Sequence, residues 1–146
     1  MAFIHRKGPA NAEQFAKAAS TAIASNSALG FLGSGYVKQA LAASLRIAGI
    51  AIGKVASTDD NYADNSLISV IVPGSDDIFE ADVTTGTATI ANVGKQYDLD
   101  TNTDGTAQGI TVSGTSYKVV TVVGYLSASK VLVKFNGAYE FANKAN

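Results

Sequence analysis

The main evidence for the fold class lies in residues 117–136, YKVVTVVGYLSASKVLVKFN. Two runs rich in β-branched residues, 117–126 and 130–136, flank the short polar segment Ser127-Ala128-Ser129. A three-residue polar break between two such runs is typical of a β-hairpin. The first run places valines on both faces of its strand, at Val119, Val120, Val122 and Val123. We therefore expect apolar cover on both sides of this hairpin, from a second layer around a closed barrel or from a subunit interface.

The same pattern of short apolar runs, separated by Gly, Asn, Asp and Ser, recurs along the chain from residue 21 onward. Nine runs are expected to be strands: 28–32, 36–40, 47–56, 67–72, 78–83, 95–99, 109–112, 117–126 and 130–136. Gly33-Ser34-Gly35 fits a further hairpin connection, and residues 88–93 fit one helical turn ended by Gly94. The sequence predicts an all-β fold, a small barrel or sandwich of about nine short strands with at most one short helix.

The first 19 residues differ from the rest, because they lack strand-like alternation and contain Gly8-Pro9. We expect residues 1–19 to form an N-terminal arm and residues 20–146 to form the β-barrel domain. Asn11 is placed to cap a short helix over residues 12–19. Such an arm packs on its own barrel or reaches across to a neighbouring subunit. The candidate contact residues are its large apolar and basic side chains, Phe3, Ile4, Arg6, Lys7 and Phe15.

The composition narrows the classes of function. The 146 residues contain no Cys, no Trp and one His, which leaves no thiol nucleophile, disulfide or zinc–thiolate site and little histidine acid–base chemistry. We therefore expect a protein that is not an enzyme and holds no cofactor. The net charge of -1 favours no nucleic acid partner, and no apolar run approaches the ~20 residues of a membrane span.

Charge is divided unevenly along the chain. Residues 1–58 carry +5, residues 59–104 carry -9 and residues 105–146 carry +3. This order fits a dipolar subunit whose copies attract each other or a neighbouring lattice. It also fits acidic side chains that are simply solvated in loops.

One acidic segment resembles part of a calcium loop. Asp100, Asn102, Asp104 and Gly105 match the first half of the loop pattern, but Thr111 stands where the bidentate Glu belongs. The two interpretations are a looser calcium site completed by Asp98 and carbonyl oxygens, and an exposed loop of Asx turns. We expect no metal.

Pairs of carboxylates also occur outside that segment, at Asp59-Asp60, at Asp76-Asp77 and at Glu80 with Asp82. Glycosidases need two carboxyl groups in a cleft lined for sugar. These acids fall in turns and strand edges and no Trp offers a sugar platform, so we interpret them as solvated edge charges. His5 lies in the arm, away from any Ser–acid pair that the sequence suggests.

Several short signatures then point to a family: IAIGKVASTDDNYA at 50–63, VIVP at 70–73, IFEADV at 78–83, VGKQYDL at 93–99, KVV at 118–120 and SKVLVKF at 129–135. Over residues 21–135 the chain resembles the small capsid decoration, or cement, proteins of tailed bacteriophages. The resemblance implies a compact β-rich subunit on the outside of an expanded head, often a trimer at local three-fold positions. It implies no active-site residue.

From this resemblance we expect the major capsid protein as partner, a homo-oligomer with a trimer favoured, and a location on the outer surface of the virion capsid after synthesis in the host cytoplasm. The arm would order on the capsid or on an adjacent subunit while the barrel bridges neighbouring capsid proteins. Two alternatives stay open. One is a β-barrel module of a tail or fibre that binds host-surface glycans, and the other is a tail-tube or adaptor subunit.

Overall fold

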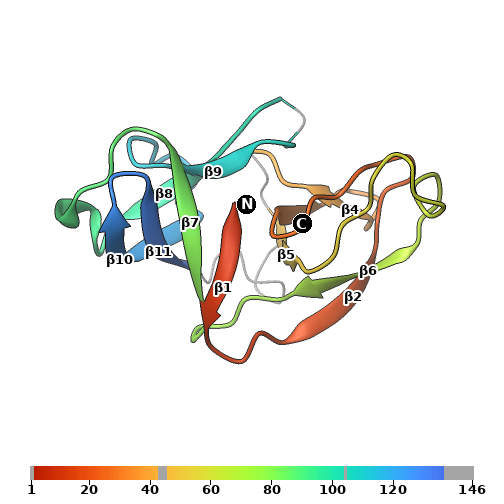
Figure 1. The fold of residues 1–146 in the computed structure, drawn as a ribbon, viewed down its shortest axis with the longest axis horizontal. Helices are drawn as coiled ribbons and strands as arrows, with labels where there is room; N and C mark the ends of the chain where they lie inside the picture. Colours follow the sequence, from red (N-terminus) through yellow and green to blue (C-terminus); the bar gives the residue numbers. More distant parts are fainter. Residues whose placement is uncertain (1, 43–45, 104, 137–146) are drawn as a thin grey trace.

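The structure is a computed structural model that describes residues 2–42, 46–103 and 105–136. Over these ranges the chain is almost entirely β (Figure 1). The elements are β1 (Phe3–Lys7), β2 (Ala12–Ala16), β3 (Ala28–Phe31), β4 (Val37–Gln39), β5 (Ile47–Ala51), β6 (Leu67–Ile71), β7 (Ile78–Thr85), the 3-10 turn η1 (Ile90–Asn92), β8 (Gln96–Thr101), β9 (Gln108–Thr111), β10 (Val120–Ser127) and β11 (Lys130–Phe135). In the described part of the chain, no helix has the length and apolarity to cross a membrane.

One of the two parts of the fold, formed by strands from residues 78–135, is a closed barrel of five strands. The strands follow the order β7, β11, β10, β8 and β9, and a parallel pairing of β9 with β7 closes the ring. The hairpin expected from residues 117–136 is present, with Val122 opposite Val133 and both side chains buried. Phe79, Leu99 and Ile110 complete the interior, so the predicted small β-barrel is confirmed.

A second sheet, in the order β2, β6, β5, β3 and β4, packs against the barrel. An isolated parallel bridge between Lys17 and Val37 joins the two ends of this sheet. Strand β5 is buried on both faces: Ile47 and Ile50 pack in the barrel-side core, whereas Ala48 and Ala51 pack in a core of the second sheet. The apolar cover on both faces of this strand is therefore supplied within one chain.

All nine strands expected from the sequence exist, although their ends differ by a few residues. The largest difference is the run 47–56, because β5 ends at Ala51 and the chain leaves the sheet as a loop. The expected hairpins β3–β4 and β10–β11 are both present. The helical turn expected over residues 88–93 is η1.

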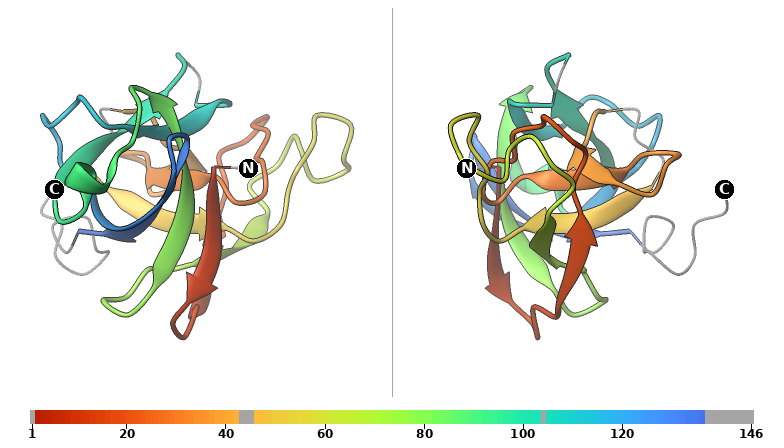
Figure 2. Two further views of the ribbon diagram at one scale, coloured as in Figure 1. Left: turned by 60° about the vertical axis from the view of Figure 1, so that its left-hand side comes forward. Right: turned by 90° about the vertical axis from the view of Figure 1, so that its right-hand side faces the viewer.

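The N-terminal segment packs on its own fold, one of the two arrangements expected for the arm, and it does so as strands. Residues 3–7 pair with β7 as β1, and residues 12–16 pair with β6 as β2, so the helix expected over 12–19 is wrong. Each half of the fold thus takes one strand from this segment, as Figure 2 shows for the two red and orange-red strands. The ladder offered by two existing strands outweighs the weak local preference for helix.

An elbow at Gly8, between β1 and β2, lets consecutive strands enter different sheets. Gly8 has φ +108, and a Cβ there would meet the Asp76 carbonyl oxygen at 2.5 Å, so glycine is required. The buried carboxylate of Asp77 holds the elbow: it accepts hydrogen bonds from the Ala10 amide at 3.0 Å and the Gly74 amide at 2.8 Å. The Nε2 atom of His5 also lies 2.8 Å from this carboxylate.

These contacts make the elbow sensitive to pH. Burial alone would raise the pKa of Asp77, but the Gly74 and Ala10 amides and the His5 ring outweigh it and hold the pKa below its ordinary value of 3.8. A depressed carboxyl pKa contributes stability above pH 3.8, and this contribution is lost as the pH falls through the folded-state value.

We expect Asp77→Asn to lower the free energy of unfolding by about 1–3 kcal/mol at pH 7, because the charged acceptor of the elbow is lost. The difference from the wild type should shrink below pH 3.8 as Asp77 becomes protonated. Urea unfolding at pH 7 and at acid pH measures both values. Asp76→Asn, at the exposed neighbouring position, is the control. A gap that stays constant with pH would contradict this account of Asp77.

Candidate functional site

The two halves of the fold are joined by buried glutamines. The Gln108 side chain on β9 accepts a hydrogen bond from the Ala28 amide at 2.7 Å and donates to the carbonyls of Ala28 at 2.9 Å and Ala40 at 3.0 Å. The Gln39 side chain accepts from the Ala24 amide and donates to the Gly105 carbonyl. The barrel and the second sheet are therefore held together by hydrogen bonds from the side-chain amides of Gln39 and Gln108.

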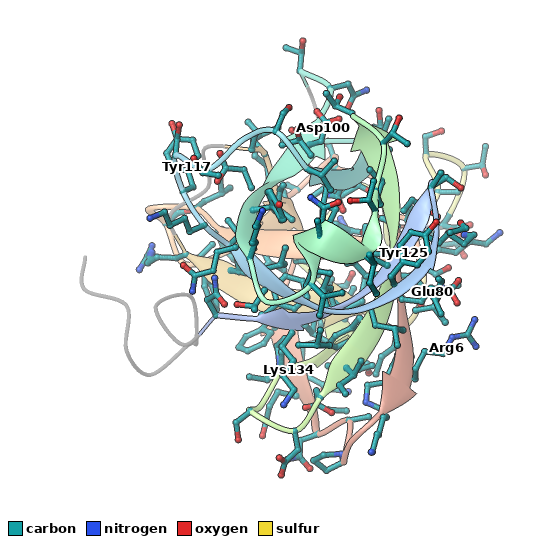
Figure 3. All side chains as sticks on the ribbon, turned by 90° about the vertical axis from the view of Figure 1, so that its left-hand side faces the viewer. Arg6, Glu80, Asp100, Tyr117, Tyr125 and Lys134 are labelled. Carbon is teal, nitrogen blue, oxygen red and sulfur yellow. The ribbon has the colours of Figure 1, made fainter. Side chains whose placement is uncertain are left out.

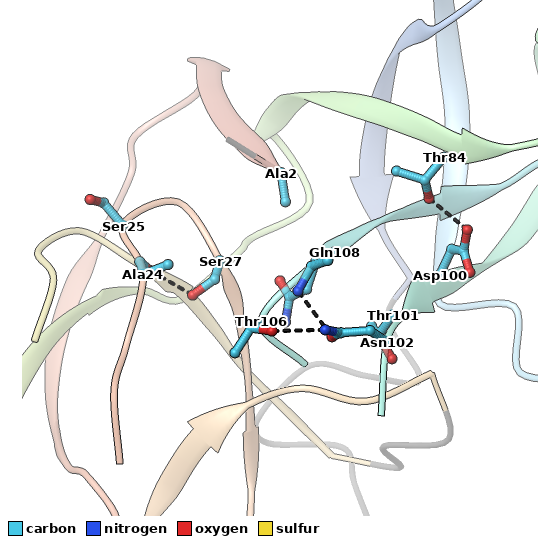
Figure 4. Close-up of a pocket in the computed structure, with 11 residues that line it drawn as sticks. Ala2, Ala24, Ser25, Ser27, Thr84, Asp100, Thr101, Asn102, Thr106 and Gln108 are labelled. Carbon is cyan, nitrogen blue, oxygen red and sulfur yellow. Dashed lines mark hydrogen bonds between the residues drawn. The ribbon is translucent and has the colours of Figure 1, made fainter. Parts of the chain in front are cut away.

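A groove lies along this junction (Figure 4). One pocket of about 390 Å³ is lined mainly by small and polar side chains, and a second of about 480 Å³ shares Ala24, Ser25 and Thr106 with it. Asp100 is the carboxylate of the first pocket, and its Oδ2 atom accepts hydrogen bonds from the hydroxyls of Thr84 at 2.6 Å and Thr85 at 2.5 Å. Neither pocket-lining set contains an aromatic side chain, so the groove offers no stacking platform for a sugar ring.

The described side chains of the calcium-loop pattern have different hydrogen-bond partners within the protein and do not converge on one site. The Asp98 carboxylate is buried and accepts the amides of Ser116, Tyr117 and Lys118 at 2.7–2.9 Å. The Asn102 side chain accepts the Ala107 amide at 3.0 Å and donates to the Thr106 hydroxyl at 2.8 Å, so it is bonded within its own loop. Asp104 lies outside the described residues, and the described part contains no group of three or more His, Cys, Asp or Glu side chains that could hold a metal ion.

Glu80 and Asp82, the carboxylate pair on one face of β7, belong to a chain of ion pairs across the outer face of the barrel (Figure 3). Arg6 lies 2.9 Å from Glu80, and Lys130 lies 2.7 Å from Asp82 and 3.6 Å from Glu80. The hydrogen bond and the charge of Asp82 raise the pKa of Lys130. Both carboxylates have cationic partners at a solvated surface, where such pairs contribute little to stability.

The five candidate contact residues of the N-terminal segment have different environments. Phe3 is buried between the rings of the core, with its ring centroid 5.4 Å from that of Phe135, so its side chain is unavailable to a partner while the fold is intact. Phe15 is half-buried, with its ring edge-on to Phe31 at 5.3 Å. Ile4 is half-buried, Lys7 is exposed, and Arg6 is exposed in its ion pair with Glu80.

This segment has one open stretch of strand edge. Among the described strands β1 pairs only with β7, but its Phe3 amide donates to the Asn26 carbonyl. Strand β2 is the end strand of its sheet, and the bridge to Val37 lies at Lys17, beyond the end of the strand. The Lys17 amide donates to the Ser66 carbonyl at 3.0 Å, which fixes the odd-numbered residues of this ladder as the ones bonded to β6. The backbone of Gln14 therefore points away from β6, and the Gln14 side chain is exposed.

A second surface is apolar. Strand β10 presents Val123, Tyr125 and Leu126 to solvent, and the adjoining turn η1 presents Ile90, which is 72% exposed, and Val93. The apolar cover predicted for both faces of this strand is thus met by the barrel core on one side only. Exposed apolar patches of this kind mark interaction surfaces in soluble proteins.

Comparison of the chain with known protein families, with curated proteins and with solved structures finds no match.

Sequence reasoning missed the contacts that shape these surfaces. His5 and Asp77 are 72 residues apart, and Gln108 and Ala28 are 80 residues apart. No local pattern joins such positions. The run FIHRK gives no signal for β1, because its apolar residues Phe3 and Ile4 are adjacent and do not alternate with polar ones.

Proposed function

We propose that this chain is a virion structural protein that binds the outer surface of an expanded phage capsid and bridges neighbouring major capsid proteins. The sequence resemblance supports this role. A subunit that binds one state of a shell stabilises that state by mass action, and many equivalent weak contacts add up through avidity.

The observation that carries the proposal is the open edge of β2. The barrel is closed on itself, and the outward amides of Phe3 on β1 and of Ala18 beyond β2 donate to the Asn26 and Val37 carbonyls. The exposed backbone of β2 at Gln14 points away from β6 and offers its donor and acceptor to a partner. Main-chain pairing with an extended segment of another protein is a common use of such an edge. This edge lies within residues 1–19, the segment that the sequence suggested as the contact with the capsid or with an adjacent subunit.

Purified particles test the role directly. Quantitative gels and a cryo-EM reconstruction of the head should find hundreds of copies as outer knobs at local symmetry axes. A handful of copies, or copies only on the tail, would overturn the proposal and favour the host-binding or tail-subunit alternatives.

Gln14→Pro tests the open edge. Proline at this position removes an amide that points away from β6, so the β2–β6 ladder stays intact and the free energy of unfolding should change by less than about 1 kcal/mol. Binding to heads that lack the protein should weaken roughly tenfold, because an added strand would lose a main-chain hydrogen bond and clash with the ring. Gln14→Ala keeps the amide and is the matched control.

Equal binding by both variants would exclude main-chain pairing at β2. Deletion of residues 1–19 is a poor test by comparison, because it removes Phe3 from the core and one strand from each half of the fold.

A further inference from the structure

The apolar face of β10 and η1 has a basic border. Lys95 lies two residues after Val93, and its carbonyl accepts the Val122 amide at 2.9 Å, so it lies beside β10. Lys134 stands on β11 opposite Thr121 of β10, and Figure 3 shows it on the same side of the barrel as Tyr125. Neither lysine has an ion pair with a carboxylate among the described residues.

The opposite end of the molecule also combines exposed apolar side chains with charged ones, but there most of the charges are negative. The loop of residues 52–66 between β5 and β6 carries Asp59, Asp60 and Asp64, all exposed. At its base, Ile52 and Leu67 are also exposed, Leu67 by 62%. Ile52 comes directly after β5, and its amide donates to the Ser69 carbonyl of β6, two residues along that strand from Leu67. In Figure 1 this yellow loop reaches the right-hand end, whereas β10 and η1 lie at the left.

We infer that the occupant of the basic apolar face is the acidic loop end of a second copy of this chain, in a head-to-tail contact. Each end supplies exposed aliphatic side chains for a dry centre. The rim is basic at one end, with Lys95 and Lys134, and net acidic at the other, with three aspartates against Lys54. A dry centre with a complementary charged rim is the usual anatomy of a specific interface. The two surfaces are different, so the contact is heterologous: it closes into a ring if the rotation permits and otherwise extends as a filament. This inference does not rest on the proposed function, because it concerns the purified chain alone.

Charge reversal at the two ends tests the contact. One variant carries Lys95→Glu and Lys134→Glu, and the other carries Asp60→Lys and Asp64→Lys; no side-chain hydrogen bond of these four residues within the described chain is at risk. Sedimentation velocity of the wild type should show self-association that weakens as salt screens the charges. Each variant alone should associate at least tenfold more weakly, because like charges then meet at the rim. An equal mixture of the two variants should associate again, since every contact between them is complementary.

Two further variants separate this contact from general effects. Glu13→Lys with Asp76→Lys makes the same change of net charge as the acidic-loop variant but at other exposed sites, and should leave association unchanged. Ile90→Ser, at an exposed position, should weaken association without loss of thermal stability. A wild type that stays monomeric at high concentration and low salt would overturn the inference. So would reversal variants that associate normally, or a mixture that does not recover.

Discussion

Replacement of Lys17 by methionine is expected to lower the free energy of unfolding by about 2–4 kcal/mol. The Lys17 side chain is fully buried, yet no carboxylate of the described chain pairs with it. Its Nζ atom donates instead to the carbonyls of Tyr62 at 2.6 Å, Asp64 at 2.7 Å and Ala18 at 3.2 Å. Methionine fills a similar volume but leaves these carbonyls without their donor, which is the costly way to break a buried hydrogen-bond network.

Lys17 also determines where the acidic loop is held. The Asn65 side chain donates to the Lys17 carbonyl, and the Tyr62 ring lies 5.8 Å from the Lys17 ammonium. Lys17, directly after β2, therefore holds the last third of the loop through both its backbone and its side chain. In the Lys17→Met variant, hydrogen exchange should accelerate over residues 56–66 before it does so in the barrel. Lys54→Met, at an exposed lysine near the base of the same loop, is the control and should be nearly neutral. Uniform acceleration over the whole chain would contradict a local clamp.

The strands could be predicted from the sequence where short apolar runs alternate with polar and turn-forming residues. The valine-rich hairpin at residues 117–136 and the polar breaks between short runs were sufficient to predict the strands β3 to β11 and the barrel. Strands β1 and β2 were not predictable in this way. Their residues form strands because β7 and β6 present ladders to them, and Gly8 with the Asp77 carboxylate sets the angle between them.

The candidate surfaces were predictable only in part. The sequence shows that the middle of the chain is acidic, and the contacts that it predicts for residues 1–19 remain a prediction. It did not indicate that Phe3 is buried, that a strand edge is left open, or that Lys95 and Lys134 border the same apolar face. Lys95 lies in the acidic segment by sequence and beside β10 in space, so charge counted along the chain hides the polarity of the folded molecule.

The junction between the two halves depends on one amide side chain more than on any other described polar group. We expect Gln108→Leu to lower the free energy of unfolding by about 2–4 kcal/mol, although leucine is apolar and of similar size. The Ala28 carbonyl keeps a second donor, the Ala40 amide, whereas the Ala28 amide and the Ala40 carbonyl lose Gln108 as a partner. Denaturant unfolding measures the loss, and Gln96→Leu, at an exposed glutamine of β8, is the control.

Hydrogen exchange shows whether the loss arises at the junction. The Ala28 amide is bonded to the Gln108 side chain, and the Ala40 amide is bonded to the Ala28 carbonyl. In Gln108→Leu, exchange at Ala28 should accelerate more than exchange at Ala40, because only the first amide loses its acceptor. Equal acceleration of the two amides would mean that the variant weakens the fold as a whole. Unchanged protection at Ala28 would mean that the side-chain amide does not hold the halves together, and the groove between them would then be free to widen.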